Sequence, residues 1–308
     1  MAPGVTGTDS ERRTPQGVSY STLPHMVNAE GQYLYCRTWE PALQAGQKLR
    51  ALLFFSHGRG SHCGVLGPIL AQLLNRHGFL VFSHDHVGHG QSEGERVYVE
   101  NFDILARDIL QHVDMMGARH PDVPIFLLGH SMGSCAGITA ACKRPGQFAG
   151  MVLASPAIEN VITSSYIYWT LAWITYKIYP SMEIPKNRHI LTKDNEKLKM
   201  YVEDPLVSGA PEIIHLGMKF LYAMLATQNL LPEVDCPFLV IHGDDDKVCD
   251  VSGAWKLYHQ ARSRDKKIKI YPNCRHVLLL ETPEDVEKVK QDILDWFLAR
   301  VTRDSKPT

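Results

Sequence analysis

The pentapeptide Gly-His-Ser-Met-Gly at residues 129–133 constrains the fold more than any other segment of the chain. It follows an apolar run at residues 125–128 and precedes a stretch, ending near Lys143, that suits a helix. A G-x-S-x-G motif between a strand and a helix is typical of the nucleophile elbow, a tight turn that lifts a serine hydroxyl above the edge of a sheet. Because the first backbone N–H groups of a helix favour negative charge, we predict that Ser131 is a nucleophile.

Apolar runs typical of strands alternate with longer helical patterns along most of the chain. Strands are expected at residues 33–39, 52–56, 79–83, 125–129, 151–155, 238–242 and 268–271. Helices are expected at residues 66–76, 102–119, 131–143 and 253–262, and from Pro283 to about Val301. Because buried apolar strands separated by helices favour parallel pairing, we predict an α/β fold whose mainly parallel sheet is covered by helices on both faces.

The alternation breaks between about residues 156 and 231, where aromatic side chains mix with methionine, proline and a helical pattern. We predict that residues 156–231 form a helical cap inserted into an α/β core made of residues 21–155 and 232–302. Residues 1–31 are mostly polar and contain no apolar segment typical of a signal peptide. We therefore expect a disordered tail at residues 1–20.

Two polar clusters downstream of Ser131 follow predicted strands. One contains Asp244, Asp245 and Asp246, and the other ends in His276. Both lie just past the carboxyl ends of strands, where open α/β sheets place their sites. A serine hydroxyl needs a base within reach and an acid that orients the base. The order Ser, Asp, His is that of α/β-hydrolases, so we predict His276 as general base and Asp246 as its orienting acid, with Asp244 and Asp245 as rivals for the acid.

A tetrahedral oxyanion needs two N–H donors. One is expected to be the backbone N–H of Met132, the residue after the nucleophile. The other is expected on the loop Ser-His-Gly-Arg-Gly at residues 56–60, which resembles the H-G-G-G type. We assign this second donor to the backbone N–H of Arg59.

Composition excludes several other classes of protein. The 308 residues are 44% hydrophobic, which suits one large domain or one domain with an insertion, and the formal net charge of -1 gives no reason to expect a nucleic acid partner. The seven cysteines are scattered without a C-x-x-C pair, so we expect neither a disulfide framework nor a zinc site, and we infer a reducing, cytoplasmic location. We do not expect the apolar stretch at 161–179 to span a membrane, because polar residues interrupt it and a span there would separate Ser131 from His276.

Several motifs resemble those of the monoglyceride lipase family of α/β-hydrolases. The similarity lies in Ser56-His57-Gly58, residues 84–94 (His-Asp-His-Val-Gly-His-Gly-Gln-Ser-Glu-Gly), residues 127–133, residues 148–153, Cys249-Asp250 and His276-Val277-Leu278. It runs from about Thr14 to the last helix and is weakest in the cap. The resemblance implies an α/β-hydrolase fold, hydrolysis of monoacylglycerols to glycerol and fatty acid, and no cofactor.

The resemblance also implies a set of site residues and a membrane-facing cap. The triad carries over as Ser131, Asp246 and His276, with Arg59 and Met132 as oxyanion donors. The family's mobile amphipathic cap implies a peripheral membrane contact. We expect that contact in the aromatic run from Tyr166 to Tyr179, where Trp169 and Trp173, four positions apart, would share one helix face.

The chain departs from the family near the expected substrate head group. Arg59 replaces a small residue, Ser61 and Val65 replace a glutamate and an arginine, and Leu279 replaces a histidine, whereas Tyr201 in the cap is retained. We assign Ser61, Tyr201 and Leu279 to substrate binding. Selectivity for glycerol is left open by these changes, and lysophospholipids or other fatty esters are alternative substrates.

Two further alternatives come from other classes of protein. The pattern His84-x-His86-x-Gly88-His89 is close to the H-x-H-x-D-H of metallo-hydrolases, although the aspartate is missing and no second ligand set follows. Arg59 and the altered head-group positions would also suit a catalytically silent lipid-binding protein on the same fold. No pattern in the sequence indicates an oligomeric state.

Overall fold

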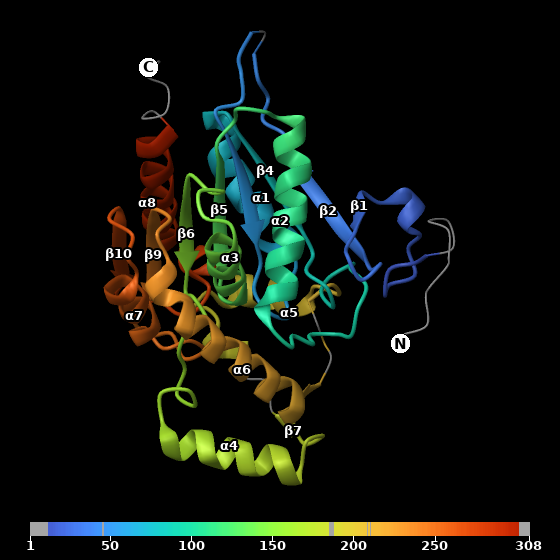
Figure 1. Cartoon of the computed structure of the whole chain (residues 1–308), viewed down its shortest axis with the longest axis vertical. Coiled ribbons are helices and arrows are strands. Elements are labelled where there is room, and N and C mark those ends of the chain that lie inside the picture. The colour runs from blue at the N-terminus through green and yellow to red at the C-terminus, as the bar shows by residue number, and fades with distance from the viewer. Residues whose placement is uncertain (1–11, 45, 185–187, 208, 210, 302–308) are drawn as a thin grey trace.

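A mainly parallel, eight-stranded sheet forms the centre of the computed structural model, which describes residues 12–301 except 45, 185–187, 208 and 210 (Figure 1). The strand order is β1-β2-β4-β3-β5-β6-β9-β10. These strands are β1 (His25–Val27), β2 (Tyr33–Trp39), β3 (Ala51–Ser56), β4 (Phe79–His84), β5 (Ile125–His130), β6 (Gly150–Ala154), β9 (Phe238–Gly243) and β10 (Lys266–Tyr271). The pairs from β4 to β10 are parallel, whereas β1 and β2 are antiparallel to their neighbours, so the predicted α/β fold is confirmed.

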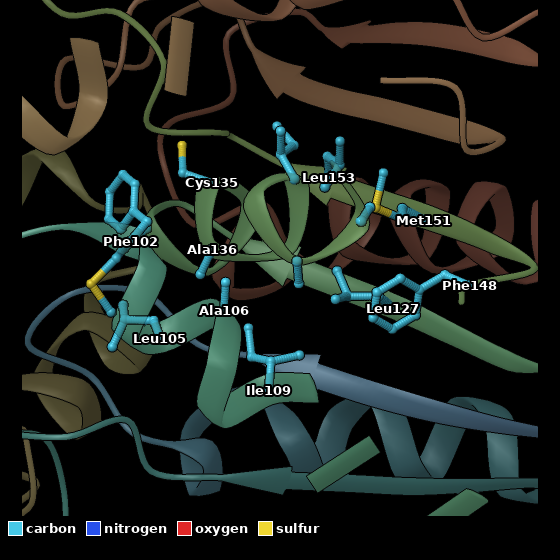
Figure 2. Close-up of a cluster of buried hydrophobic side chains, with 14 of the residues drawn as sticks. Phe102, Leu105, Ala106, Ile109, Leu127, Cys135, Ala136, Phe148, Met151 and Leu153 are labelled. Atoms are coloured by element: carbon cyan, nitrogen blue, oxygen red, sulfur yellow. The ribbon is translucent and has the colours of Figure 1, made fainter. Parts of the chain in front are cut away.

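Helices cover both faces of the sheet because its strands are apolar on both sides. In β3, Leu52 and Phe54 join one buried cluster, and Leu53 and Phe55 join the other, as the alternation of side chains along a strand requires. Figure 2 shows the first cluster between sheet and helices. Helices α2 (Phe102–Arg119), α3 (Met132–Lys143) and α7 (Ser252–Gln260) contribute to the first cluster, and α1 (Cys63–Leu74) and α8 (Pro283–Val301) contribute to the second.

The chain leaves the sheet between β6 and β9, and we call residues 156–231 the cap segment. Its elements are α4 (Tyr166–Ile178), β7 (Glu183–Ile184), α5 (Asn195–Glu203), β8 (Glu212–Ile213) and α6 (Ile214–Leu230), and β7 pairs with β8 in an antiparallel ribbon. In Figure 1, α6 lies between the sheet and α4, so α4 is the part of the cap segment farthest from the sheet.

The N-terminal region differs from the expected disordered tail. Residues 1–11 lie outside the described part of the chain, but Arg12 forms an ion pair with Glu93 (2.6 Å). Tyr20 is fully buried, and its hydroxyl donates a hydrogen bond to the carbonyl oxygen of Gln91 (2.5 Å). The polar composition of the segment gave no indication of this contact. A single buried tyrosine is enough to hold the segment against the 84–94 loop. At the other end, residue 302 of the predicted core lies outside the described residues.

The apolar stretch of the cap segment is too short to span a bilayer as a helix. Helix α4 has 13 residues, whereas a span needs about 20. Within the described ranges, the structure contains no helix with both the length and the apolar character of a membrane span.

Candidate active site

Ser131 lies in a constrained turn between β5 and α3. Its backbone angles are φ 55° and ψ −118°, a combination that residues with side chains rarely adopt outside functional sites. A Cβ atom on Gly133 would lie 2.0 Å from the carbonyl oxygen of Ser56, so only glycine fits there. The close approach of β3 and α3 therefore dictates the glycine of the motif and fixes Ser131 beside the end of β3.

The carboxylate of Asp246 is bonded to two imidazoles and two backbone amides. Oδ2 accepts a hydrogen bond from Nδ1 of His276 (2.7 Å) and lies 3.0 Å from Nε2 of His242. Oδ1 accepts from the backbone N–H groups of Val248 (2.8 Å) and Cys249 (3.0 Å). Burial alone would raise the pKa of Asp246, but the imidazole of His276 and the hydrogen bonds from both rings hold that pKa well below its usual range.

The other two carboxylates of the acidic turn have structural partners. Asp244 accepts a hydrogen bond from the backbone N–H of Asn273 (2.5 Å), and Asp245 forms an exposed ion pair with Lys247 (2.9 Å). Of the three candidates for the acid, Asp246 is therefore the one that the structure places in contact with His276.

The loop after β3 packs directly against Ser131. A Cβ atom on Gly58 would lie 2.9 Å from Nδ1 of His130 and 3.3 Å from Cβ of Ser131. Arg59 follows in this loop, and Met132 is the first residue of α3, whose initial N–H groups have no acceptor within the helix. The backbone amides of Arg59 and Met132 thus belong to the two segments that flank Ser131.

The histidines of the 84–94 loop form hydrogen bonds with the end of β3, with the loop that follows it and with α2. The backbone N–H of His86 donates to Nε2 of His57 (2.9 Å), and the ring of His86 bonds the hydroxyl of Ser56 (2.9 Å). Nδ1 of His84 lies 3.2 Å from Nδ1 of His112. Burial lowers the pKa of His57, His84 and His86 well below the usual value, so these rings are neutral. Among the described residues, no three His, Cys, Asp or Glu side chains are arranged to hold a metal ion.

Ser131 and His276 line a cavity of about 460 Å³ between the sheet and the cap segment. The cap segment contributes mostly apolar side chains to its wall: Ile162, Ala172, Ile184, Ile190, Leu191, Ile214, Met218, Phe220, Leu221 and Met224. The core contributes Val65, Leu66, Val248, Cys249 and Val277. Burial raises the pKa of the Cys249 thiol well above its usual value, so the thiol in this wall is uncharged. The cavity has the volume and apolar lining of a small-molecule site.

Two of the three residues assigned to substrate binding line this cavity. Ser61 and Tyr201 both contribute to its wall. Leu279, by contrast, is buried in the core cluster that includes α8, and it is not among the residues that line the cavity. It lies in a short 3₁₀ turn, Leu278–Leu280, which directs it into the core.

The side chain of Arg59 joins the core to the cap segment. Its guanidinium group forms an ion pair with Glu212 of β8 and lies 5.2 Å from the ring centre of Phe220 in α6. Arg59 and Glu212 both line the cavity, and both side chains are mostly buried. The extra charge that Arg59 brings is therefore balanced by Glu212.

Two functional contacts escaped the sequence analysis. His242 was taken only as the end of an apolar strand, and its one available signal was an imidazole four positions before Asp246. Glu212 had no such signal, because its partner Arg59 is 153 positions away in the sequence.

A serine at the elbow after β5, with a bonded Asp–His pair after β9 and β10, defines an α/β-hydrolase. A family model described as "Serine aminopeptidase, S33" matches residues 47–283. The monoglyceride lipase of Homo sapiens is 43% identical over 293 residues, 94% of this chain and 95% of the relative, and that of Mus musculus is 42% identical over 294 residues, 95% of each chain. The crystal structure of Paleococcus ferrophilus monoacylglycerol lipase is also similar, with 26% identity, a TM-score of 0.73, and coverage of 87% of this chain and 99% of that one.

The chain belongs to the monoglyceride lipase family. It is a carboxylic ester hydrolase of the serine type, as the family match and the two mammalian relatives show.

Proposed function

We propose that this protein hydrolyses monoacylglycerols to glycerol and a free fatty acid. Ser131 is the nucleophile, His276 the general base and Asp246 the acid that orients it. The observation that carries the proposal is the 2.7 Å hydrogen bond between Asp246 and His276, in an apolar cavity that His276 shares with Ser131. The identity with two mammalian monoglyceride lipases supports the choice of substrate.

The reaction follows from these groups and water, without a cofactor. Nε2 of His276 takes the proton of the Ser131 hydroxyl as Oγ attacks the ester carbonyl carbon, and the backbone N–H groups of Arg59 and Met132 stabilise the oxyanion. The imidazolium then gives its proton to the departing glycerol oxygen, which leaves an acyl-serine. His276 next takes a proton from water, whose oxygen attacks the acyl carbon, and the fatty acid is released as Ser131 recovers its proton.

The wall of the cavity combines many apolar side chains with a few polar ones. The aliphatic and aromatic side chains from the cap segment suit an acyl chain. The hydroxyl groups of Ser61 and Tyr201 in its wall suit the glycerol head group, because each can both donate and accept.

A broader fatty-ester esterase is the second candidate function. The ion pair with Glu212 neutralises the charge of Arg59, so the polar contacts left for a head group are uncharged side chains such as Asn160, Ser61 and Tyr201. Few fixed polar contacts select weakly among head groups. A panel of monoacylglycerols, short esters and lysophospholipids separates this candidate from a dedicated monoacylglycerol lipase.

We also propose that the protein is cytoplasmic and contacts membranes through α4. Ile167, Leu171, Ile174 and Ile178 lie on one face of this helix and are all exposed. The opposite face, including Trp169, packs toward the apolar cluster that contains α6. An exposed aliphatic stripe beside a lipid cavity suits extraction of substrate from a bilayer.

The proposed catalytic role is tested by covalent labelling with a fluorophosphonate probe. The wild-type protein should become labelled on Ser131, as located by peptide mass analysis, and Ser131→Ala should remain unlabelled while keeping the melting temperature of the wild type. A folded wild-type protein that takes up no probe would instead be a catalytically silent lipid-binding homologue.

A further inference from the structure

His242 supplies a second imidazole to the carboxylate that orients His276. It is the penultimate residue of β9 and is fully buried. Its Nε2 atom lies 3.0 Å from Oδ2 of Asp246, the same oxygen that accepts the hydrogen bond from His276. With the two backbone amides on Oδ1, this contact completes four hydrogen bonds to one carboxylate.

The position of the proton on His242 follows from its neighbours. Besides Oδ2 of Asp246, Nε2 faces the carbonyl oxygen of Cys249 at 3.1 Å. An ionised carboxylate and a carbonyl only accept hydrogen bonds, so Nε2 carries the proton and shares it between them. Nδ1 is buried and has no hydrogen-bond partner among the described residues. The ring is therefore a donor aimed at Asp246 and at the loop that holds Asp246.

We propose that His242 is a positioning residue for ester hydrolysis, acting on His276 through Asp246. Its Nε2–H bond draws negative charge away from Oδ2, so Asp246 stabilises the imidazolium form of His276 less strongly. Loss of this bond should therefore favour the imidazolium form of His276 and weaken its action as a base. The second hydrogen bond of His242, to the carbonyl oxygen of Cys249, fixes the loop whose backbone amides bind Oδ1 of Asp246. This proposal rests on the proposed Ser131–His276–Asp246 set.

The other titratable groups around His242 keep the same charge over the pH range of the labelling assay. His130 from β5 has a pKa lowered to about 3, mainly by burial. Burial raises the pKa of Cys249 well above its usual value. Hydrogen bonds from Ser252 lower the pKa of Asp250, which therefore keeps its charge. A change in the acidic limb of the pH profile thus reports on the pair Asp246 and His276.

The test compares His242→Leu, which removes the donor, with His242→Gln, which keeps one. The readout is the second-order rate of fluorophosphonate labelling of Ser131 between about pH 5 and 9, which needs no lipid interface. For His242→Leu we expect the rate at optimal pH to fall about tenfold, as for loss of one hydrogen bond to a charged group. The midpoint of the acidic limb should rise by roughly half a pH unit. His242→Gln should keep both values near those of the wild type.

A matched control separates positioning from stability. Val240 lies two residues earlier in β9 and is equally buried, so Val240→Ala weakens the same strand without touching Asp246. It should lower the melting temperature and leave the pH profile unchanged. If His242→Leu does not fold, His242→Asn replaces it, because its shorter side chain withdraws the donor from Asp246.

A double variant tests whether His242 acts on the labelling rate through Asp246. In an Asp246→Asn background, His242→Leu should cost little further in labelling rate, because the negative charge on which His242 acts is gone. The proposal is overturned if His242→Leu leaves the midpoint and the rate unchanged, if His242→Gln behaves like His242→Leu, or if the effect persists in Asp246→Asn. Labelling that survives in Ser131→Ala would instead overturn the proposed nucleophile, so the two failures are distinguishable.

Discussion

Arg59, in the loop beside Ser131, forms an ion pair with Glu212 of β8 and thereby connects the α/β core to the cap segment. Both residues line the cavity, so the pair is part of the wall that a substrate meets. The guanidinium group also lies over the ring of Phe220, which holds it on the cap side. The side chain of Arg59 is therefore engaged with the cap segment, while its backbone N–H belongs to the loop that flanks Ser131.

Removal of the Arg59 side chain should leave hydrolysis intact. Arg59→Ala keeps the backbone N–H that we assign to the oxyanion, so kcat should stay within about threefold of the wild type and should rise with long acyl chains as the cavity widens. The measurement is kcat and KM on short-chain and long-chain monoacylglycerols. Glu212→Gln, which breaks the same ion pair from the other side, is the control. A large loss of kcat in Arg59→Ala alone would mean that the guanidinium itself acts in catalysis or binds the head group.

Replacement of Asp246 should be far more damaging than replacement of either neighbouring aspartate. Asp246→Asn deprives His276 of its acceptor and permits the wrong tautomer, so kcat should fall by about 10³-fold or more. Asp244→Asn and Asp245→Asn alter groups bonded to Asn273 and Lys247 and should cost less than about threefold. These two variants are the matched controls. A severe effect in Asp245→Asn with a mild one in Asp246→Asn would contradict the assignment of the acid.

The contribution of Asp246 to stability should vanish in acid. Its pKa is depressed in the folded protein, so the ionised form stabilises the fold at all pH values above the unfolded value, about 4. As the pH falls below that value toward the folded pKa, this contribution is lost. The difference in melting temperature between wild type and Asp246→Asn should therefore shrink as the pH falls below about 4. A difference that grows below about pH 4 would show that the folded pKa is raised.

The exposed stripe of α4 should mediate binding to membranes. The triple change Ile167→Ser, Leu171→Ser and Ile174→Ser removes apolar surface that is free of the core. Binding to phosphatidylcholine vesicles, measured by co-sedimentation, should fall about tenfold or more, while turnover of a short, water-soluble ester is unchanged. Equal vesicle binding by wild type and triple variant would place the membrane contact elsewhere.

Trp169 provides the control for this helix. Trp169 and Trp173 differ in their surroundings, because Trp169 packs against Tyr222 of α6 with ring centres 5.5 Å apart, whereas Trp173 is exposed. Trp169→Ser should therefore lower the melting temperature and weaken the activity on both kinds of substrate. The triple variant at Ile167, Leu171 and Ile174 should keep the melting temperature of the wild type and its activity on the soluble ester.

The elbow and the strands could be predicted because their signals are local. The run of apolar residues before Ser131, the glycine after it and the helical pattern beyond are adjacent in the sequence, and steric fit dictates them. The order of the parallel strands then brings the turns after β9 and β10 together, which is why Asp246 and His276 could be paired.

Contacts between distant elements could not be predicted in the same way. The ion pair of Arg59 with Glu212 joins the loop after β3 to β8, and their approach depends on how the cap segment packs. Leu279 was assigned to the substrate because it replaces a family histidine, but its turn places it in the core. The buried environment of Tyr20 likewise arises from the 84–94 loop, far away in the sequence.

The central claim, that Ser131 and its partners cleave monoacylglycerols, is tested most directly by the release of glycerol from a long-chain monoacylglycerol. The wild-type protein should release glycerol and fatty acid in equal amounts and should act more slowly on the lysophospholipid with the same acyl chain. Ser131→Ala, His276→Ala and the double variant should all fall to the same residual rate, because members of a catalytic set act as a unit and their losses do not add. Glycerol release that persists in Ser131→Ala, or a wild-type protein that cleaves the lysophospholipid and spares the monoacylglycerol, would contradict the account.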